Sequence, residues 1–172
     1  CYIDDQFFNT VARIVFAQCC FYIYFDIFIF DQIDDVIQCF VVCAAVILPN
    51  GYSNPLINDS KKLSEKKREA LYDVIVQDAL AYEIKIVTEQ EVDEKNIYRA
   101  TQWAMSQIAS NLKSDLVLSD AMPLPEIKDR PVYDLVKGDQ KSISIAAASI
   151  LAKVTRDRIM NELDEKYPGY GL

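Results

Sequence analysis

A helix built almost entirely from small residues limits how this chain can fold. Residues 137–157 read KGDQKSISIAAASILAKVTRD, with a turn predicted at Gly138 and three alanines and a serine at 146–149. A helix surface with so little side-chain volume can lie unusually close to a sheet or to the backbone of a ligand. This stretch is therefore expected to be the helix on which the fold is packed.

The polar side of that helix carries three chemically different groups. Ser149, Lys153 and Asp157 follow one another at intervals of four residues, which places them on one helix face. A hydroxyl, an ammonium and a carboxylate suit a phosphate or a metal ion. The same spacing is also typical of an amphipathic helix whose polar side is merely solvated, so the spacing alone leaves both interpretations open.

Hydrophobic patterning and turn residues predict an alternation of strands and helices along the chain. Strands are expected at residues 21–30, 41–48, 81–88, 116–119 and 132–136, and helices at 64–79, at 93–112 and, after the turn at Gly138, up to about residue 166. The helix at Ser64 has an incomplete capping box, because Lys67 stands where Glu is usual. Strands followed by helices indicate a layered α/β fold.

Composition indicates one globular domain over residues 1–172 that does not bind nucleic acid by overall charge. The net charge is −8, so any phosphate contact must come from a local basic patch. No apolar run is long enough to span a bilayer and no signal peptide is evident, so we expect a cytoplasmic protein. The five cysteines lie within the first 43 residues, and the chain has no histidine, which argues against a zinc site.

Residues 1–40 differ in composition from the rest of the chain. All eight phenylalanines lie there, whereas glycine, proline and lysine are missing from this stretch. The composition changes abruptly at Val41, where VVCAAVIL predicts a buried strand.

Several separate blocks together resemble ribonuclease HII over about residues 41–172. They are NDSKKLSEKKREALY at 58–72, KNIYRATQWAM at 95–105, SDAMPLP at 119–125, the 137–157 stretch and YPGYG at 167–171. The resemblance implies the ribonuclease H-like fold, a central mixed β-sheet of about five strands flanked by helices. The family would continue beyond Leu172 through a further helix, so we expect that family extension to be absent.

The resemblance also implies an activity. Ribonuclease HII is a metal-dependent endonuclease that hydrolyses the RNA strand of RNA–DNA hybrids and cuts 5′ to ribonucleotides embedded in duplex DNA. The expected partners are therefore such a hybrid or duplex, with no membrane, and the protein is expected to be a monomer. A cluster of carboxylates holding two Mg²⁺ or Mn²⁺ ions would serve this chemistry without a protein nucleophile.

The matching blocks imply specific metal ligands. Asp120 ends a predicted strand, and Asp157 belongs to the TRD block; both match family ligands. Without the resemblance, Asp120 would be an aspartate at a turn, and Asp157 a surface ion-pair partner. An ungapped count back from Val41 places Asp31 at a third ligand position and Phe30 at a fourth, where no ligand is possible.

Candidate substrate contacts are mostly basic. Lys61, Lys62, Lys137 and Lys153 are expected to form the local patch for phosphates, with Ser149 beside them on the helix face. Tyr170 resembles a family tyrosine that could stack on the sugar at a DNA–RNA junction.

The Asp-Glu-x-Gly-Arg-Gly motif of the family is missing from the first-strand region. The same count places Ile33, Asp34 and Asp35 at the Gly-Arg-Gly positions, where the family reads the 2′-hydroxyl. Either residues 1–40 are an altered segment on a ribonuclease HII body, or the chain is a diverged relative that binds nucleic acid without cutting it. A third possibility is that this segment prevents proper folding.

Overall fold

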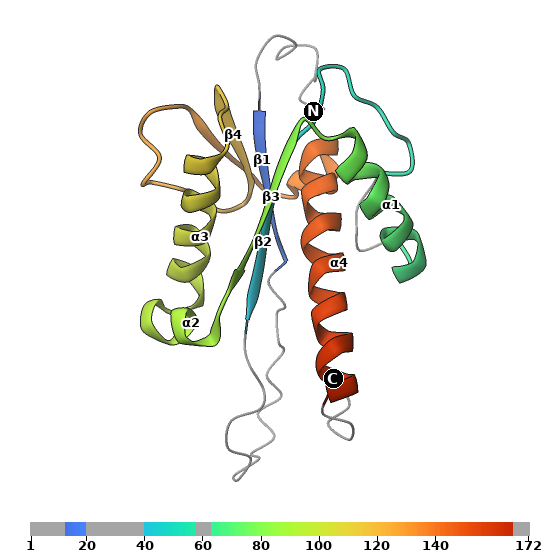
Figure 1. Cartoon of the computed structure of the whole chain (residues 1–172). Helices are drawn as coiled ribbons and strands as arrows, with labels where there is room; N and C mark the ends of the chain where they lie inside the picture. The colour runs from blue at the N-terminus through green and yellow to red at the C-terminus, as the bar shows by residue number, and fades with distance from the viewer. Residues whose placement is uncertain (1–12, 20–39, 58–62, 167–172) are drawn as a thin grey trace.

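The computed structural model describes residues 13–19, 40–57 and 63–166, which form one mixed sheet between two helical layers (Figure 1). The sheet has five strands in the order β3-β2-β1-β4-β5. Their bounds are Arg13–Cys19 for β1, Val41–Ile47 for β2, Ala81–Val87 for β3, Leu116–Asp120 for β4 and Val132–Leu135 for β5. The expected α/β fold with a central mixed sheet is thus confirmed.

Strand direction changes at the middle of the sheet. β2 pairs antiparallel with both β1 and β3, whereas β4 pairs parallel with both β1 and β5. The carboxyl ends of β1, β4 and β5 consequently lie at one edge of the sheet, where α/β proteins commonly place functional residues.

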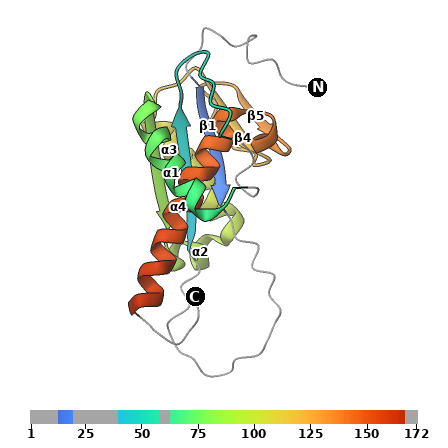
Figure 2. The ribbon, with the colours of Figure 1, turned by 90° about the vertical axis from the view of Figure 1, so that its right-hand side faces the viewer.

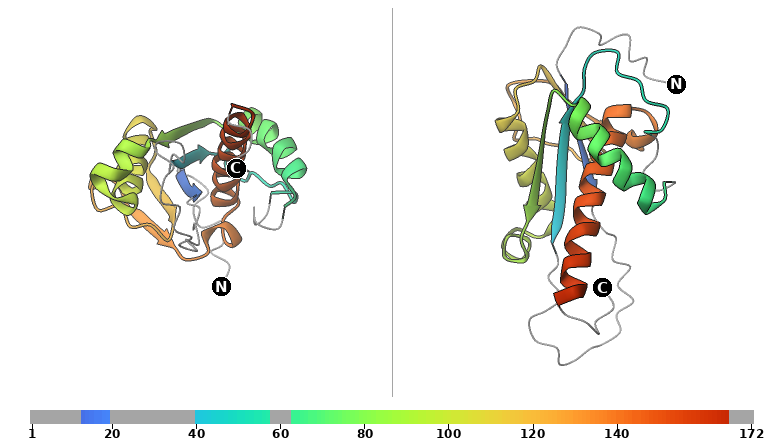
Figure 3. Two further views of the ribbon diagram at one scale, coloured as in Figure 1. Left: turned by 90° about the horizontal axis from the view of Figure 1, so that it is seen from below. Right: turned by 45° about the vertical axis from the view of Figure 1, so that its right-hand side comes forward.

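Helices cover both faces of the sheet. α1 (Glu65–Asp78) and α4 (Ile143–Lys166) lie on one face, and α2 (Glu89–Lys95) and α3 (Ile97–Asn111) lie on the other (Figures 2 and 3). α4 packs across β1 and β2. It does so through fully buried alanines at 146, 147, 148 and 152. The expectation that the small-residue helix lies directly on the sheet is confirmed.

Two apolar cores result, one on each face of the sheet. β2 is buried along its whole length and contributes alternate residues to each core, Val42, Ala44 and Val46 to the α1/α4 side. Such a continuous apolar strand is typical of a position buried on both faces.

The first strand of the structure is one that the sequence analysis did not predict. Residues 21–30 lie outside the described residues, and the sheet position between β2 and β4 is occupied by Arg13–Cys19. The predicted strand at residues 21–30 therefore stays a prediction, whereas the place of Arg13–Cys19 in the sheet is set by strand pairing, which is a long-range choice.

The predicted helix at residues 93–112 is two helices in the structure. α2 starts earlier, with a capping box in which the Thr88 side chain accepts from Glu91 N and the Glu91 side chain accepts from Thr88 N. It ends at Asn96, whose φ of 60° breaks the helix, and the Asn96 side chain then caps α3 by accepting from Arg99 N. Among the described residues, no helix has the length and apolar character required to cross a membrane.

Candidate active site

Asp120 is the last residue of β4 and lies half-buried at the carboxyl edge of the sheet. Its Oδ1 accepts a hydrogen bond from the backbone N–H of Gly138, with an N–O distance of 2.9 Å. The next residue, Ala121, has a φ of 52°, a left-handed conformation that costs energy for a residue with a side chain. Backbone strain directly after a carboxylate is a feature that functional sites tolerate.

The turn after Asp120 is held by its neighbours on both sides. The Oγ of Ser119, a fully buried residue, donates to the carbonyl of Met122 at 2.6 Å, and Ala121 N donates to Leu135 O at 3.1 Å. These bonds fix the direction in which the Asp120 carboxylate leaves the sheet.

Gly138 is required at its position because the space around it is already filled. A Cβ there would lie 2.5 Å from Cδ1 of Ile145 and 3.4 Å from Oδ1 of Asp120. Ile145 is fully buried, so its side chain has little room to move. Only glycine therefore permits the close approach that brings its N–H to the Asp120 carboxylate.

Asp139 follows Gly138, so a second acidic residue comes directly after the backbone N–H that binds Asp120. It lies in η3, a single 3-10 turn at Gly138–Gln140, and is only 7% exposed. Buried aspartates are uncommon unless they are paired or coordinate a metal. The sequence patterns did not single out Asp139, although it lies in the KGDQ string that opens the 137–157 stretch.

Two further groups lie close in sequence to this pair. Lys137 is exposed and has a left-handed backbone, with φ 56° and ψ 48°, directly before Gly138. Ser142 is buried, and its Oγ has no hydrogen-bond partner within the described part of the chain. An unpartnered buried hydroxyl in the segment between η3 and α4 indicates a place where water or an ion completes the hydrogen bonding.

The sheet register identifies the first-strand position that lies level with Asp120. Phe16 of β1 pairs with Ser119, so the next position, Ala17, lies beside Asp120 in the sheet. The ungapped count had placed Phe30 and Asp31 at this edge, but both lie outside the described residues. Across residues 13–19, 40–57 and 63–166, no group of three or more His, Cys, Asp or Glu side chains could hold a metal ion.

The structure does not place Asp157 with Asp120 and Asp139. It lies on α4 fourteen residues beyond Ile143, about 21 Å along the helix axis. There its Oδ2 pairs with Nη2 of Arg68 on α1 at 3.0 Å. Helical spacing had correctly put Asp157 on one face with Ser149 and Lys153, and all three are half-buried. Asp157 contacts α1 through Arg68, and the metal-ligand interpretation of Asp157 stays a prediction.

Three other predicted contacts cannot be located. Lys61, Lys62 and Tyr170 lie outside the described residues, so they remain predictions from the sequence.

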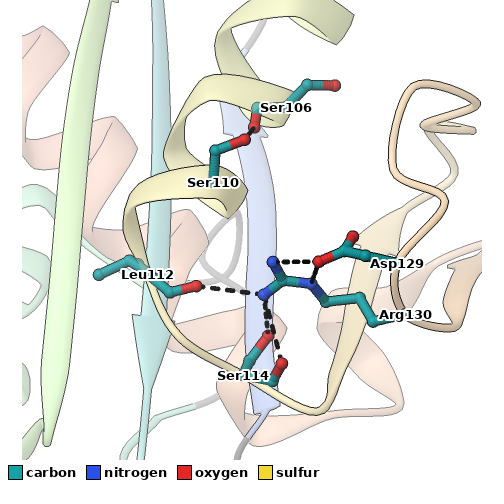
Figure 4. A network of polar contacts seen from close by, with 6 residues as sticks. All are labelled: Ser106, Ser110, Leu112, Ser114, Asp129 and Arg130. Atoms are coloured by element: carbon teal, nitrogen blue, oxygen red, sulfur yellow. Dashed lines mark hydrogen bonds and ion pairs between the residues drawn. The ribbon is translucent and has the colours of Figure 1, made fainter.

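The loop that follows Asp120 is anchored at its far end by Arg130 (Figure 4). Its Nη1 donates to the carbonyls of Leu112 and Ser114, each at 3.2 Å, and its Nε and Nη2 donate to Asp129 Oδ2 at 3.0 and 2.8 Å. The hydrogen bond from Arg130 lowers the pKa of Asp129 below its ordinary value. The β4–β5 loop is thereby tied to the chain between α3 and β4, at the amino ends of β4 and β5 and so at the opposite edge of the sheet from Asp120.

Comparison with known proteins identifies the family. The family model described as Ribonuclease HII matches residues 35–172. The chain belongs to the ribonuclease HII family. It is 56% identical to a ribonuclease HII of Bacillus cereus over 134 residues, which are 77% of this chain and 51% of that protein.

Solved ribonuclease structures share the fold. The chain is similar to the structure of the PCNA:RNase HII complex from Archaeoglobus fulgidus, with a TM-score of 0.71, 26% identity and coverage of 92% of this chain and 78% of that chain. It also has the fold of ribonuclease H2 from Pyrococcus horikoshii OT3, with a TM-score of 0.68, 22% identity and coverage of 93% and 79%.

The ribonuclease HII match includes Asp120 and Asp139 but not the first strand. It begins at residue 35, whereas β1 ends at Cys19. The chain spans about half the length of the curated relatives it matches.

Proposed function

We propose that this chain is a metal-dependent endonuclease of the ribonuclease HII type. It would hydrolyse the RNA strand of RNA–DNA hybrids and cut 5′ to ribonucleotides embedded in duplex DNA, acting as a monomer. The observation that carries the proposal is the hydrogen bond from Gly138 N to Asp120 Oδ1, because it brings the turn that contains the buried Asp139 to the end of β4.

The donor chemistry of this site fits Mg²⁺ or Mn²⁺. Asp120 and Asp139 would hold the ion through carboxylate oxygens, which these hard cations prefer. The unpartnered Oγ of Ser142 supports the fit, because a hydrated ion would supply the partner that it lacks. A divalent ion bound there would supply Lewis-acid activation of a water and stabilise charge on the scissile phosphate.

Basic and polar side chains would then hold the substrate. Lys137 is exposed and adjacent to the carboxylates, so it can contact a phosphate next to the cut. Lys61, Lys62, Ser149 and Lys153 are proposed to contact the strands further away. In the same proposal, Tyr170 stacks on the sugar at the junction.

A second candidate is a relative that binds nucleic acid without cutting it. The observation that favours it lies in the sheet register: the β1 position level with Asp120 is Ala17, which provides no carboxylate. Two carboxylates hold a divalent ion more weakly than three or four. A chain that keeps the fold could thus bind a hybrid and fail to assemble a working metal site.

One cleavage experiment separates the two candidates. The substrate is a DNA duplex with a single ribonucleotide, incubated with the chain in Mg²⁺ and then in Mn²⁺. Cutting that is lost in Asp120→Asn and in Asp139→Asn, but kept in the surface control Glu162→Gln, would support the endonuclease. Salt-dependent hybrid binding with no cutting at any Mn²⁺ concentration would support the binding protein.

A further inference from the structure

Asp157 is the centre of a half-buried ion pair that joins α4 to α1. Its Oδ2 lies 3.0 Å from Nη2 of Arg68, and its Oδ1 lies 3.6 Å from Nη1 of Arg156. The Arg68 and Asp157 side chains are only 12% and 23% exposed. Solvent therefore screens this pair less than it screens an ordinary surface pair.

Arg68 also holds the chain where α1 begins. Its Nη1 donates to the carbonyl of Leu63 at 2.7 Å. The N-cap residue, Ser64, makes no side-chain hydrogen bond to the helix. Because the usual cap is missing, the guanidinium of Arg68 supplies the contact that ties the start of α1 to α4.

The first turn of α1 carries exposed cations that do not serve the stability of the helix. Lys66 and Lys67 are both exposed, and a positive charge near a helix N-terminus is disfavoured by the helix dipole. Exposed lysines at such a place are suited to contact the phosphates of a nucleic acid. Their position then depends on how firmly this turn is fixed.

We propose that Asp157 is a positioning residue for nucleic-acid binding. Acting through Arg68, it fixes the first turn of α1 against α4 and so sets where Lys66 and Lys67 meet the phosphate backbone. The nucleic-acid ligand of this Arg68–Asp157 clamp rests on the proposed function, whereas the contact between the two helices does not. It gives Asp157 a role in substrate affinity instead of a role in metal binding.

A second contact between the same two helices provides a matched control. Glu69 of α1 pairs with Arg158 of α4 at 2.7 Å, but these side chains are 48% and 44% exposed. An exposed pair of this kind contributes little. Glu69→Gln therefore removes one charge and one α1–α4 contact without touching the clamp.

Hydrogen exchange tests whether the clamp exists. In Asp157→Asn, the amide of Arg68, which donates to Ser64 O, and the amides of the following turn of α1 are expected to exchange about tenfold faster. Asp157→Glu, which keeps the charge, should recover part of the protection, and Glu69→Gln should show almost none of the loss. Unchanged exchange in Asp157→Asn would overturn the proposal.

Two binding measurements test what the clamp does. By fluorescence anisotropy without divalent ions, Asp157→Asn should bind an RNA–DNA hybrid about tenfold more weakly, while its Mn²⁺ affinity by electron paramagnetic resonance stays unchanged. Loss of Mn²⁺ binding with unchanged hybrid affinity would make Asp157 a metal ligand and overturn the proposal. A wild-type chain that binds no hybrid would refute the proposed function, and the exchange data would then decide the clamp alone.

Discussion

Replacing Gly138 with alanine is expected to destabilise the protein and disturb the carboxylate pair together. The added Cβ would lie 2.5 Å from Cδ1 of the fully buried Ile145, which is too close for a real contact. Overpacking of this kind costs about 1–3 kcal/mol. The backbone φ of Gly138 is not in the left-handed region. Alanine therefore also lowers the entropy of the unfolded chain, which offsets about 0.4–1 kcal/mol of the overpacking cost.

The net loss of stability should be about 1–2 kcal/mol, which is a fall of about 2–8 °C in Tm for a domain of this size. Differential scanning calorimetry measures it directly. Ile145→Val removes the Cδ1 atom that clashes, so the double variant Gly138→Ala/Ile145→Val should be more stable than the sum of the two single changes predicts.

Gly51→Ala is the matched control. Gly51 has a φ of 71°, and a Cβ added there would meet nothing within 4 Å. Alanine at this position should lower stability only by the left-handed backbone penalty of about 1–2 kcal/mol. The Mn²⁺ affinity of Gly51→Ala should equal that of the wild type. Strictly additive effects of Gly138→Ala and Ile145→Val, with unaltered Mn²⁺ affinity, would refute the argument that this close approach positions the site.

The remaining predictions concern the supports of the fold. Arg130→Gln should lower the free energy of unfolding by about 1–3 kcal/mol, because the carbonyls of Leu112 and Ser114 lose a charged donor; an unchanged denaturant midpoint would contradict this. Thr88→Ala should cost about 1 kcal/mol through loss of the capping box at α2, and unchanged exchange of the α2 amides would count against it. The backbone hydrogen bond from Thr88 lowers the pKa of Glu91 below its ordinary 4.5. Glu91 therefore stabilises the fold above that pH, and the stability difference between wild type and Glu91→Gln should shrink as the pH falls below it; a difference that grows on acidification would contradict the assignment.

Much of the fold was predictable because it depends on local pattern. Local pattern predicts three of these elements and their burial: the continuous apolar run of β2, the alternation of β3 and the small-residue face of α4. The incomplete capping box was visible from Lys67, but the lack of any hydrogen bond from the Ser64 side chain to the helix was not predicted.

The parts that failed depend on choices that a local pattern cannot encode. The central strand Arg13–Cys19 was not predicted, because its place is set by long-range pairing with β2 and β4. The division between α2 and α3 arises from the positive φ of Asn96, which the helical pattern of the sequence does not reveal.

The site was half predictable for a related reason. Asp120 could be placed at a strand end from the sequence, and it lies there. Its carboxylate neighbour could not be identified by helical spacing, because Asp139 belongs to a 3-10 turn that a glycine brings back to the sheet. Helical spacing correctly grouped Asp157 with Ser149 and Lys153, but it could not show that Asp157 pairs with Arg68 of α1.

The central claim is that Asp120 and Asp139 form the metal site, and Mn²⁺ titration by isothermal calorimetry tests it most directly. We expect binding to be lost or severely weakened in Asp120→Asn and in Asp139→Asn, and to be unchanged in Glu162→Gln. Full Mn²⁺ affinity in a folded Asp139→Asn variant would contradict the account.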